Sequence, residues 1–181
     1  MIEAISLAFH PATPPHAIRE VSARIIGFDE NWLRLRWTLL GTGDLVVPAF
    51  AGKGRADGLW QTTCFEFFLQ PADGAGYVEL NLSPSERWNA YRFAARREGM
   101  EELPMPHEPT CTWRQGTDRA IFDAAVPASA LPATPWQCAF TAVIEESGGH
   151  KSYWSVAHGG ERPDFHDPAC FTLQVAAPQR P

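Results

Sequence analysis

The prolines of this chain are spread along its length, from Pro11 to Pro181, instead of being gathered in one segment. Together with the glycines they make 16 + 14 = 30 of the 181 residues, so few stretches lack a residue that interrupts a helix. Long helices are therefore disfavoured over most of the sequence. The chain is expected to consist mainly of β-strands and turns.

Apolar and polar side chains alternate in many short segments, which is typical of strands with one buried face. The clearest case is residues 33–39, where leucines and a tryptophan alternate with Arg34, Arg36 and Thr38. Other predicted strands lie at residues 5–9, 64–69, 78–82, 88–94, 119–126, 137–145, 152–157 and 170–176. A further strand is predicted within residues 16–26, although this segment also fits a helical stripe, and a helical turn is predicted at residues 128–131.

Roughly nine or ten short strands separated by turn residues are the number expected of a β-sandwich. The fold class predicted is therefore all-β, a two-sheet antiparallel β-sandwich. A chain of 181 residues is long enough to bury one sizeable core. Residues 1–181 are accordingly predicted to form a single domain.

Charge and targeting signals exclude several classes of protein. The formal net charge is −6 and the sequence has no basic run, which disfavours nucleic-acid binding. Residues 1–15 contain no Lys or Arg before their apolar part and reach a proline at Pro11, which fits neither a secretion signal nor a spanning helix. We therefore expect a cytoplasmic protein without a membrane partner. The 4 cysteines are far apart and form no C-x-x-C pair, so no metal or cofactor is expected and buried free thiols are one interpretation.

Two predicted hairpins share one central strand, and the alternation allows their registers to be predicted. With Phe68 opposite Tyr77, Glu66 lies opposite Glu79, whereas a slip of one residue would mix the two faces. The same rule in the second hairpin pairs Glu79 with Arg92. The polar and aromatic face predicted in this way carries Cys64, Glu66, Phe68, Tyr77, Glu79, Asn81, Trp88 and Arg92.

Two directly opposed carboxylates, Glu66 and Glu79, would stand about 5 Å apart and repel each other. They need a counter-cation, a shared proton or solvent between them, and Arg92 could supply the cation. One interpretation is a solvated ladder of these three residues that contributes little to stability. The neighbouring aromatic residues favour the other interpretation, a site for a flat ligand with apolar patches and hydroxyl groups.

Three segments of the sequence carry a resemblance to a known family: Leu59–Leu69, Tyr77–Phe93 and Ser152–Phe171. In these segments the chain resembles the DOMON-like domains of bacterial proteins, which are similar to family 9 carbohydrate-binding modules. The resemblance implies a β-sandwich that binds a ligand without hydrolysing it. In family 9 modules a sugar is held between tryptophan rings, and Trp60, Trp88 and Trp154 are candidates by their chemistry. Neither a secretion signal nor an attached catalytic domain is expected from this sequence, and a small soluble ligand is therefore expected in place of a polysaccharide.

Residues 158–170 bring together His, Asp and Cys side chains, but their spacing matches no standard zinc pattern. The segment is either an irregular loop fixed by its prolines or a rim over the ligand face, with His158 and His166 as hydrogen-bond donors. DOMON-type relatives also include haem binders with His or Met ligands. Met105 and His107 form a close pair of these residue types here, in a segment flanked by prolines.

An enzyme would have to use Glu66 and Glu79 as an acid and base pair, because carboxylates about 5 Å apart resemble retaining glycosidases. The sequence contains no nucleophile elbow, P-loop, dinucleotide fingerprint or H-E-x-x-H signature. No catalytic residue is therefore assigned, and catalysis is less favoured than binding.

The main hypothesis is a β-sandwich that binds a small saccharide or sugar derivative without cleaving it. The alternatives are a protein-interaction or dimerisation module, a haem-binding protein and a carboxylate-pair hydrolase. The candidate ligand-binding residues are Trp60, Glu66, Tyr77, Glu79, Asn81, Trp88, Arg92, Trp154, His158 and His166.

Overall fold

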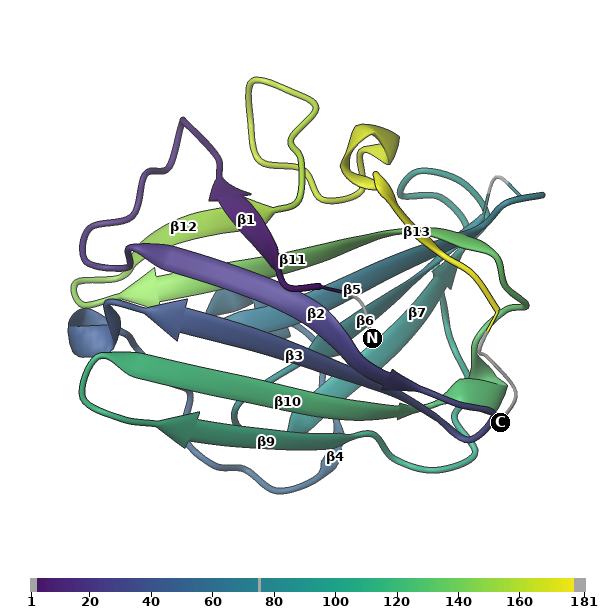
Figure 1. Cartoon of the computed structure of the whole chain (residues 1–181), viewed down its shortest axis with the longest axis horizontal. Helices are drawn as coiled ribbons and strands as arrows, with labels where there is room; N and C mark the ends of the chain where they lie inside the picture. Colours follow the sequence, from purple (N-terminus) through teal and green to yellow (C-terminus); the bar gives the residue numbers. More distant parts are fainter. Residues whose placement is uncertain (1–2, 75, 178–181) are drawn as a thin grey trace.

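The structure is a computed structural model that describes residues 3–74 and 76–177, and in this part of the chain the regular elements are strands and short 3₁₀ turns (Figure 1). The strands are β1 (Ile5–Phe9), β2 (Glu20–Phe28), β3 (Trp32–Leu40), β4 (Gly54–Arg55), β5 (Cys64–Pro71), β6 (Tyr77–Leu82), β7 (Arg87–Phe93), β8 (Glu101–Glu102), β9 (Thr110–Gln115), β10 (Arg119–Pro127), β11 (Trp136–Glu146), β12 (His150–Ser155) and β13 (Leu173–Val175). The turns are η1 (Thr42–Asp44), η2 (Leu59–Gln61), η3 (Ala128–Ala130) and η4 (Pro168–Cys170). The all-β prediction is confirmed.

The strands form one continuous hydrogen-bonded path in the order β4-β7-β6-β5-β11-β12-β1-β2-β3-β10-β9, with β13 beside β11 and β8 beside β7. The path curls into two facing layers, a front layer of β2, β3, β10 and β9 and a back layer of β7, β6, β5, β11 and β12 (Figure 1). This differs from two separate antiparallel sheets. The short β4 pairs in parallel with β7, and β1 joins the layers because its first half pairs with β2 and its second half with β12. A strand shared in this way leaves neither layer with an open edge at that point.

The core lies between the two layers and is built from the apolar positions of the alternating segments. On β3 the side chains of Leu33, Leu35, Trp37 and Leu39 are fully buried, as the period of two predicts. The Trp37 ring contacts aromatic rings of both layers: Phe122 at 5.9 Å, Phe65 at 5.5 Å and Phe140 at 5.2 Å between centroids. Burial of the apolar faces of both layers therefore holds them together.

The β5–β6 hairpin differs from its predicted register by two residues. Phe68 pairs with Glu79 instead of Tyr77, and Glu66 pairs with Asn81. The shift occurs because β5 extends further into the connecting loop than the alternation indicates. A shift of two keeps every side chain on its predicted face, but it places the two glutamates diagonally to each other and not directly opposite.

The β6–β7 hairpin closes through a three-residue loop at residues 84–86. The Glu86 N–H donates to the Ser83 carbonyl at 3.0 Å, and the Ser83 N–H donates to the Arg87 carbonyl at 3.0 Å. Glu86 itself has a φ of 69°. A turn followed by a left-handed residue is a common three-residue hairpin connection. The loop therefore holds an odd number of residues, where the predicted register requires an even number.

This loop shifts the β6–β7 register by one residue, and the predicted pairing of Glu79 with Arg92 is wrong. Glu79 pairs with Tyr91, and Arg92 pairs with Val78. A slip of one residue moves every side chain of β7 to the other face. The prediction that Trp88 and Arg92 share the face of Glu79 is therefore also wrong.

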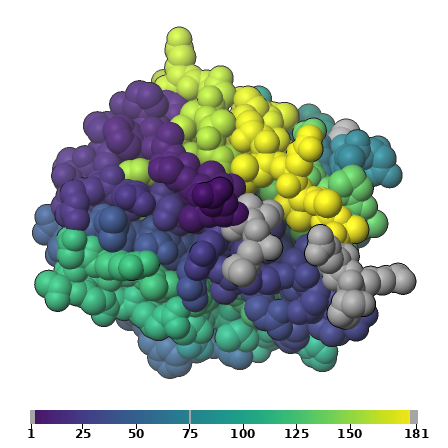
Figure 2. All heavy atoms as spheres, viewed as in Figure 1, coloured from purple at the N-terminus to yellow at the C-terminus, as the bar shows by residue number. Residues whose placement is uncertain are grey.

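The segment that follows β1 and the loop between β12 and β13 lie side by side at the top of the molecule (Figures 1 and 2). We call the latter, residues 156–172, the C-terminal loop. His10 donates from Nε2 to the Gly160 carbonyl at 3.0 Å while its Nδ1 accepts from the Ala12 N–H. His158 Nε2 bonds the Ala8 carbonyl at 2.8 Å. These bonds fix the start of the C-terminal loop against the N-terminal segment.

Within the described residues, no helix has the length and apolarity needed to cross a membrane. The interpretation of the cysteines as buried free thiols is confirmed for Cys64, Cys111, Cys138 and Cys170. The predicted helical turn at residues 128–131 is present as η3.

Candidate functional site

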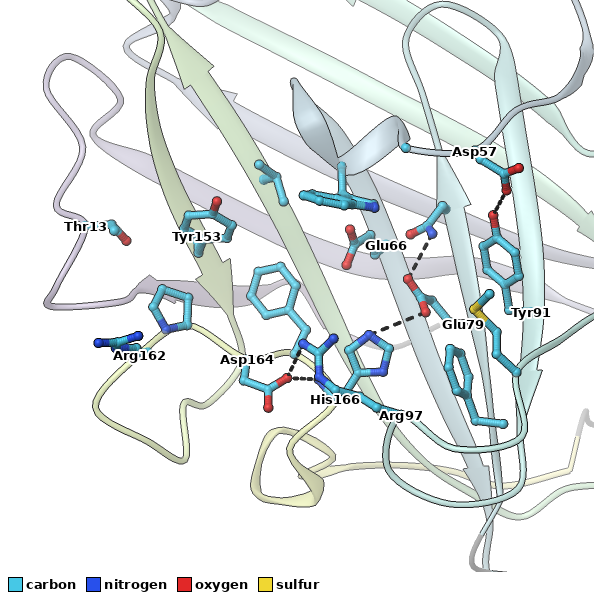
Figure 3. Close-up of a pocket in the computed structure, with 18 of the residues that line it drawn as sticks. Thr13, Asp57, Glu66, Glu79, Tyr91, Arg97, Tyr153, Arg162, Asp164 and His166 are labelled. Atoms are coloured by element: carbon cyan, nitrogen blue, oxygen red, sulfur yellow. Dashed lines mark hydrogen bonds and ion pairs between the residues drawn. The ribbon is translucent and has the colours of Figure 1, made fainter.

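A cavity of about 1060 Å³ opens on the face of the back layer that points away from the core (Figure 3). Its floor is the outer surface of β5, β6, β7, β11 and β12. Its walls come from four segments that are far apart in the sequence: residues 12–13, 57–60, 97–100 and 162–166. Loops from both ends of the chain thus enclose one surface of the sheet.

Two carboxyl groups and an amide lie together on the cavity floor. Asn81 on β6 lies directly opposite Glu66 on β5, and its Nδ2 donates to Glu79 Oε1 at 2.9 Å. Thr141 on β11 donates its hydroxyl to Glu66 Oε2 at 3.2 Å. Glu66 and Asn81 are 3% exposed and Glu79 is 7% exposed. The floor is therefore a desolvated group of hydrogen-bonding side chains.

Burial raises the pKa of both carboxyl groups, because it removes solvent from the charged form. Burial brings the pKa of Glu79 to about 7, although the hydrogen bond from Asn81 and the charge of Arg97 act to lower it. Burial, and then the negative charge of Glu79, raise the pKa of Glu66 well above its ordinary value. Both groups therefore keep a proton at pH values where surface carboxyl groups are ionised.

The C-terminal loop places His166 against Glu79. The Arg97 backbone N–H donates to the Tyr77 hydroxyl at 3.1 Å, and that hydroxyl is hydrogen-bonded to His166 Nδ1 at 2.7 Å. The other ring nitrogen of His166, Nε2, lies 3.6 Å from Glu79 Oε2. Burial, followed by the charge of Arg97, lowers the pKa of His166 to about 4. His166 is therefore a neutral imidazole that faces Glu79.

A second hydrogen-bond cluster fixes Tyr91 in the cavity wall. The Tyr91 hydroxyl donates to Asp57, and Asn89 Nδ2 donates to Asp57 Oδ1 at 3.0 Å and to the Tyr91 hydroxyl at 2.8 Å. Arg55 Nη1 holds Asn89 Oδ1 at 2.7 Å. Burial, then the bond and the charge of Asp57, raise the pKa of Tyr91. The ring is thus held in one orientation with its hydroxyl protonated.

Ion pairs join two of the loops at the cavity rim. Asp164 accepts from Arg96 Nη2 at 2.6 Å and from Arg97 Nη2 at 2.8 Å, and Figure 3 shows Arg97 beside Asp164. Burial alone would raise the pKa of Asp164, but the two guanidinium groups lower it.

The ring of Trp60, in η2, lines the cavity and is 51% exposed.

The structure brings about half of the sequence-predicted residues into this cavity. Trp60, Glu66, Glu79, Asn81 and His166 line it. A sixth, the tyrosine at position 77, lies behind His166 and positions the imidazole through its hydroxyl. The polar part of the predicted face is therefore assembled in three dimensions.

Trp88 and Arg92 lie on the other face of β7. Trp88 is buried in the core, with the Arg55 guanidinium 4.4 Å from its ring centroid. Arg92 is exposed and pairs with Glu101 of β8, so it supplies no cation to the two carboxyl groups. Both placements follow from the one-residue shift of the β6–β7 hairpin.

Replacing Arg92 with methionine should change the free energy of unfolding by less than about 0.5 kcal/mol, because an exposed ion pair contributes little. The small difference should disappear at high salt concentration, where exposed charges are screened. Denaturant unfolding of the parent and of Arg92→Met at two salt concentrations measures it. A loss above about 1 kcal/mol that persists in salt would show that Arg92 acts on the buried carboxyl groups.

Trp154 and His158 are also outside the cavity lining. Trp154 is 2% exposed in the core, where its Nε1 donates to Ser152 Oγ at 2.9 Å. His158 bonds the Ala8 carbonyl and contacts the ring of His10. Neither lines the cavity, so the prediction that Trp154 and His158 contact a ligand does not hold for this cavity.

Several lining residues were missed by the sequence analysis. Tyr91 and Phe93 alternate with apolar residues on β7, and the correct hairpin register would have placed them beside Glu79. Tyr153 alternates with buried residues of β12 in the same way. Asp57 and Arg97 lie in loops, where no local pattern indicates a shared site.

The other groups of candidate ligand residues predicted from the sequence do not come together in the cavity. Met105 packs against the core cluster, whereas His107 is exposed. Among residues 3–74 and 76–177, no group of three or more His, Cys, Asp or Glu side chains is arranged to hold a metal ion. Of the segment at residues 158–170, the part around His166 forms a wall of the cavity.

No family model matches the chain, and no curated protein matches it in sequence. Solved structures match it in fold. A proposed carbohydrate-binding protein from Bacteroides uniformis superposes with a TM-score of 0.63 at 19% identity, over 94% of this chain and 84% of that one. A family 9 carbohydrate-binding module from Caldicellulosiruptor kristjanssonii, in complex with cellotriose, gives a TM-score of 0.55 at 12% identity, over 97% and 84%.

At these identities the likeness shows the fold: the chain has the β-sandwich-like fold of family 9 carbohydrate-binding modules. The expected relation to DOMON-like domains stays a prediction.

Proposed function

We propose that this protein binds a small saccharide or sugar derivative in the cavity and does not cleave it. The observation that carries the proposal is the lining, in which an exposed tryptophan and two tyrosines stand beside buried hydrogen-bonding groups: Trp60, Tyr91, Tyr153, Glu66, Glu79 and Asn81. Sugars combine apolar ring faces with hydroxyl groups, so they suit a site of this mixed character. The shared fold with carbohydrate-binding modules supports the same ligand class.

The size of the cavity supports a small ligand. A volume of about 1060 Å³ lies at the upper end of ordinary small-molecule sites. The loops that rise around the floor on several sides favour a short saccharide over a long polymer chain. Several fixed groups, including Tyr91 and His166, are held in place before any ligand arrives, which lowers the entropic cost of binding.

The state of the two carboxyl groups supports binding over hydrolysis. A retaining glycosidase needs one ionised nucleophile and one protonated acid, so its environment moves the two pKa values apart. Here burial raises the pKa of both Glu66 and Glu79. Two protonated carboxyl groups hydrogen-bond well and are poor nucleophiles.

A panel of mono- and oligosaccharides and sugar nucleotides tests the proposal, with melting temperature and tryptophan fluorescence as readouts. We expect at least one member to raise the melting temperature of the parent. Trp60→Ala should weaken its affinity by about tenfold or more, which corresponds to about 1.4 kcal/mol. Phe50→Ala is the matched control, because Phe50 is 75% exposed and does not line the cavity. If no sugar changes either readout, the saccharide proposal is abandoned.

A further inference from the structure

The cavity floor offers one buried acceptor that no group of the described residues satisfies. Asn81 lines the cavity and is 3% exposed, and its Oδ1 has no hydrogen-bond partner among residues 3–74 and 76–177. Its amide donor is already engaged by Glu79. A buried polar atom without a partner is costly, and it indicates that a donor from outside the protein belongs there.

The two carboxyl groups beside Asn81 form no ion pair with an Arg or Lys side chain of the described residues. Arg97 lines the cavity and its charge acts to lower the pKa of both groups, but its guanidinium is paired with Asp164 at 2.8 Å. Arg162 also lines the cavity. His166 faces Glu79 as a neutral imidazole. In the described part of the chain no other cationic side chain pairs with Glu66 or Glu79. The floor therefore combines one unsatisfied acceptor, Asn81 Oδ1, with two carboxyl groups that become negatively charged when they lose their protons.

We propose that the ligand carries a primary amine, as in an amino sugar, and that its ammonium group binds between Glu66, Glu79 and Asn81 Oδ1. This inference rests on the proposed saccharide-binding function and narrows it to one chemical class. An ammonium group has three N–H donors, and the floor presents three acceptor groups in one cluster. Glu66 and Asn81 are a directly opposed pair with Cβ atoms about 5 Å apart, and Glu79 lies diagonally to Glu66, so the three groups are close enough to bind one nitrogen.

The walls are compatible with a cation. The aromatic rings of Trp60, Tyr91 and Tyr153 line the cavity, and aromatic faces attract ammonium groups. A neutral sugar hydroxyl, by comparison, brings a single donor and leaves acceptors of the floor unsatisfied. Charge-assisted hydrogen bonds are also about twice as strong as neutral ones. The floor should therefore bind an amino sugar more tightly than the parent sugar, which has a hydroxyl group in place of the amine.

Binding of an ammonium should release protons. In the empty cavity Glu79 is largely protonated near pH 6, since burial raises its pKa to about 7. The ammonium stabilises the carboxylate, so the carboxyl proton of Glu79 passes to the buffer as the ion pair forms, and the charge balances. A neutral ligand gives no such release. The other titratable or charged groups that line the cavity are Asp57, Tyr91, Arg97, Tyr153, Arg162, Asp164 and His166. Cys64 and Tyr77 also interact electrostatically with the pair.

The test is isothermal titration of the protein with glucosamine, galactosamine and mannosamine, each beside its parent hexose and its N-acetyl derivative. We expect at least one hexosamine to bind at least about tenfold more tightly than both neutral counterparts. Titrations near pH 6 in two buffers of different ionisation enthalpy should show a proton release that approaches one per amine bound. This second measurement uses the parent protein and needs no variant.

Two isosteric variants and a control test whether Glu66 and Glu79 cause the preference for the amine. Glu79→Gln and Glu66→Gln should each remove most of the preference for the amine, and Glu79→Gln should abolish the proton release near pH 6. Glu101→Gln is the matched control, because Glu101 is an exposed carboxyl group that does not line the cavity, and it should keep the preference.

The outcomes separate the two proposals. If a hexose and its hexosamine bind equally, the saccharide site stands and the amine inference is overturned. If a saccharide binds but no hexosamine does, the amine inference is likewise overturned. If hexosamines bind more tightly in Glu79→Gln and Glu66→Gln than in the parent, the ammonium is not held by these carboxyl groups, and the inference fails.

Discussion

Replacing Trp37 with alanine is expected to lower the free energy of unfolding by about 3–5 kcal/mol. Trp37 is fully buried and contacts aromatic rings of both layers. Removing the indole leaves a cavity at the centre of the core, where both layers are anchored by other strands and cannot collapse into it. Denaturant unfolding of the parent and variant gives the difference directly, with an unchanged dependence on denaturant concentration.

Trp60→Ala is the control for this prediction, because it makes the same chemical change at an indole that is 51% exposed. It should cost less than about 1 kcal/mol. If Trp37→Ala also lost less than about 1.5 kcal/mol, the two layers would not depend on this contact. The comparison separates loss of core packing from loss of a tryptophan as such.

The alternation of apolar and polar residues predicted the strands because successive side chains of a strand point alternately into the core and away from it. Residues 33–39 and 119–126 were predicted as strands and lie within β3 and β10. Strand β9 was missed because most of its side chains are exposed and only Cys111 on it is buried, so its sequence shows no apolar alternation. The join between the layers was also missed, because β1 changes partners halfway and no periodic pattern marks such a change.

The candidate site was predicted only as far as the hairpin registers were correct. Glu66, Glu79 and Asn81 were placed on one face because a register error of two residues preserves the face. Trp88 and Arg92 were misplaced because the next hairpin was wrong by one. That error traces to Glu86, whose φ of 69° is uncommon for a residue with a side chain.

The rest of the site depends on contacts between distant segments. Asp57 reaches Tyr91 and Asp164 reaches Arg97 across separations of 34 and 67 residues. Asp57, Arg97 and Asp164 are loop residues, and nothing in the local sequence marks them as parts of one site. Only the packing of loops around the sheet shows that they enclose one cavity.

Glu79→Gln is expected to stabilise the protein at alkaline pH and to leave it nearly unchanged in acid. Burial raises the folded-state pKa of Glu79 from 4.5 to about 7. A raised acid pKa means that the folded protein holds the proton more tightly than the unfolded chain. The contribution of Glu79 to stability is therefore fully present below about pH 4.5 and is lost as pH rises through 7. The shift corresponds to at most about 3 kcal/mol.

Glutamine has the shape of the protonated carboxyl group and cannot ionise, so the variant should lack this loss. Near pH 4 the two proteins should unfold at similar denaturant concentrations, and near pH 8 the variant should be more stable by up to about 3 kcal/mol. Asp164 and Glu146 have lowered pKa values and contribute equally in both proteins. The pKa of Glu66 should fall in the variant, because the charge of Glu79 no longer raises it, and this change adds to the gain at high pH. If the difference were the same at both pH values, Glu79 would be ionised in the empty cavity. Glu79 would then already be negatively charged before any ligand bound, and the binding of an ammonium group would release no proton from it.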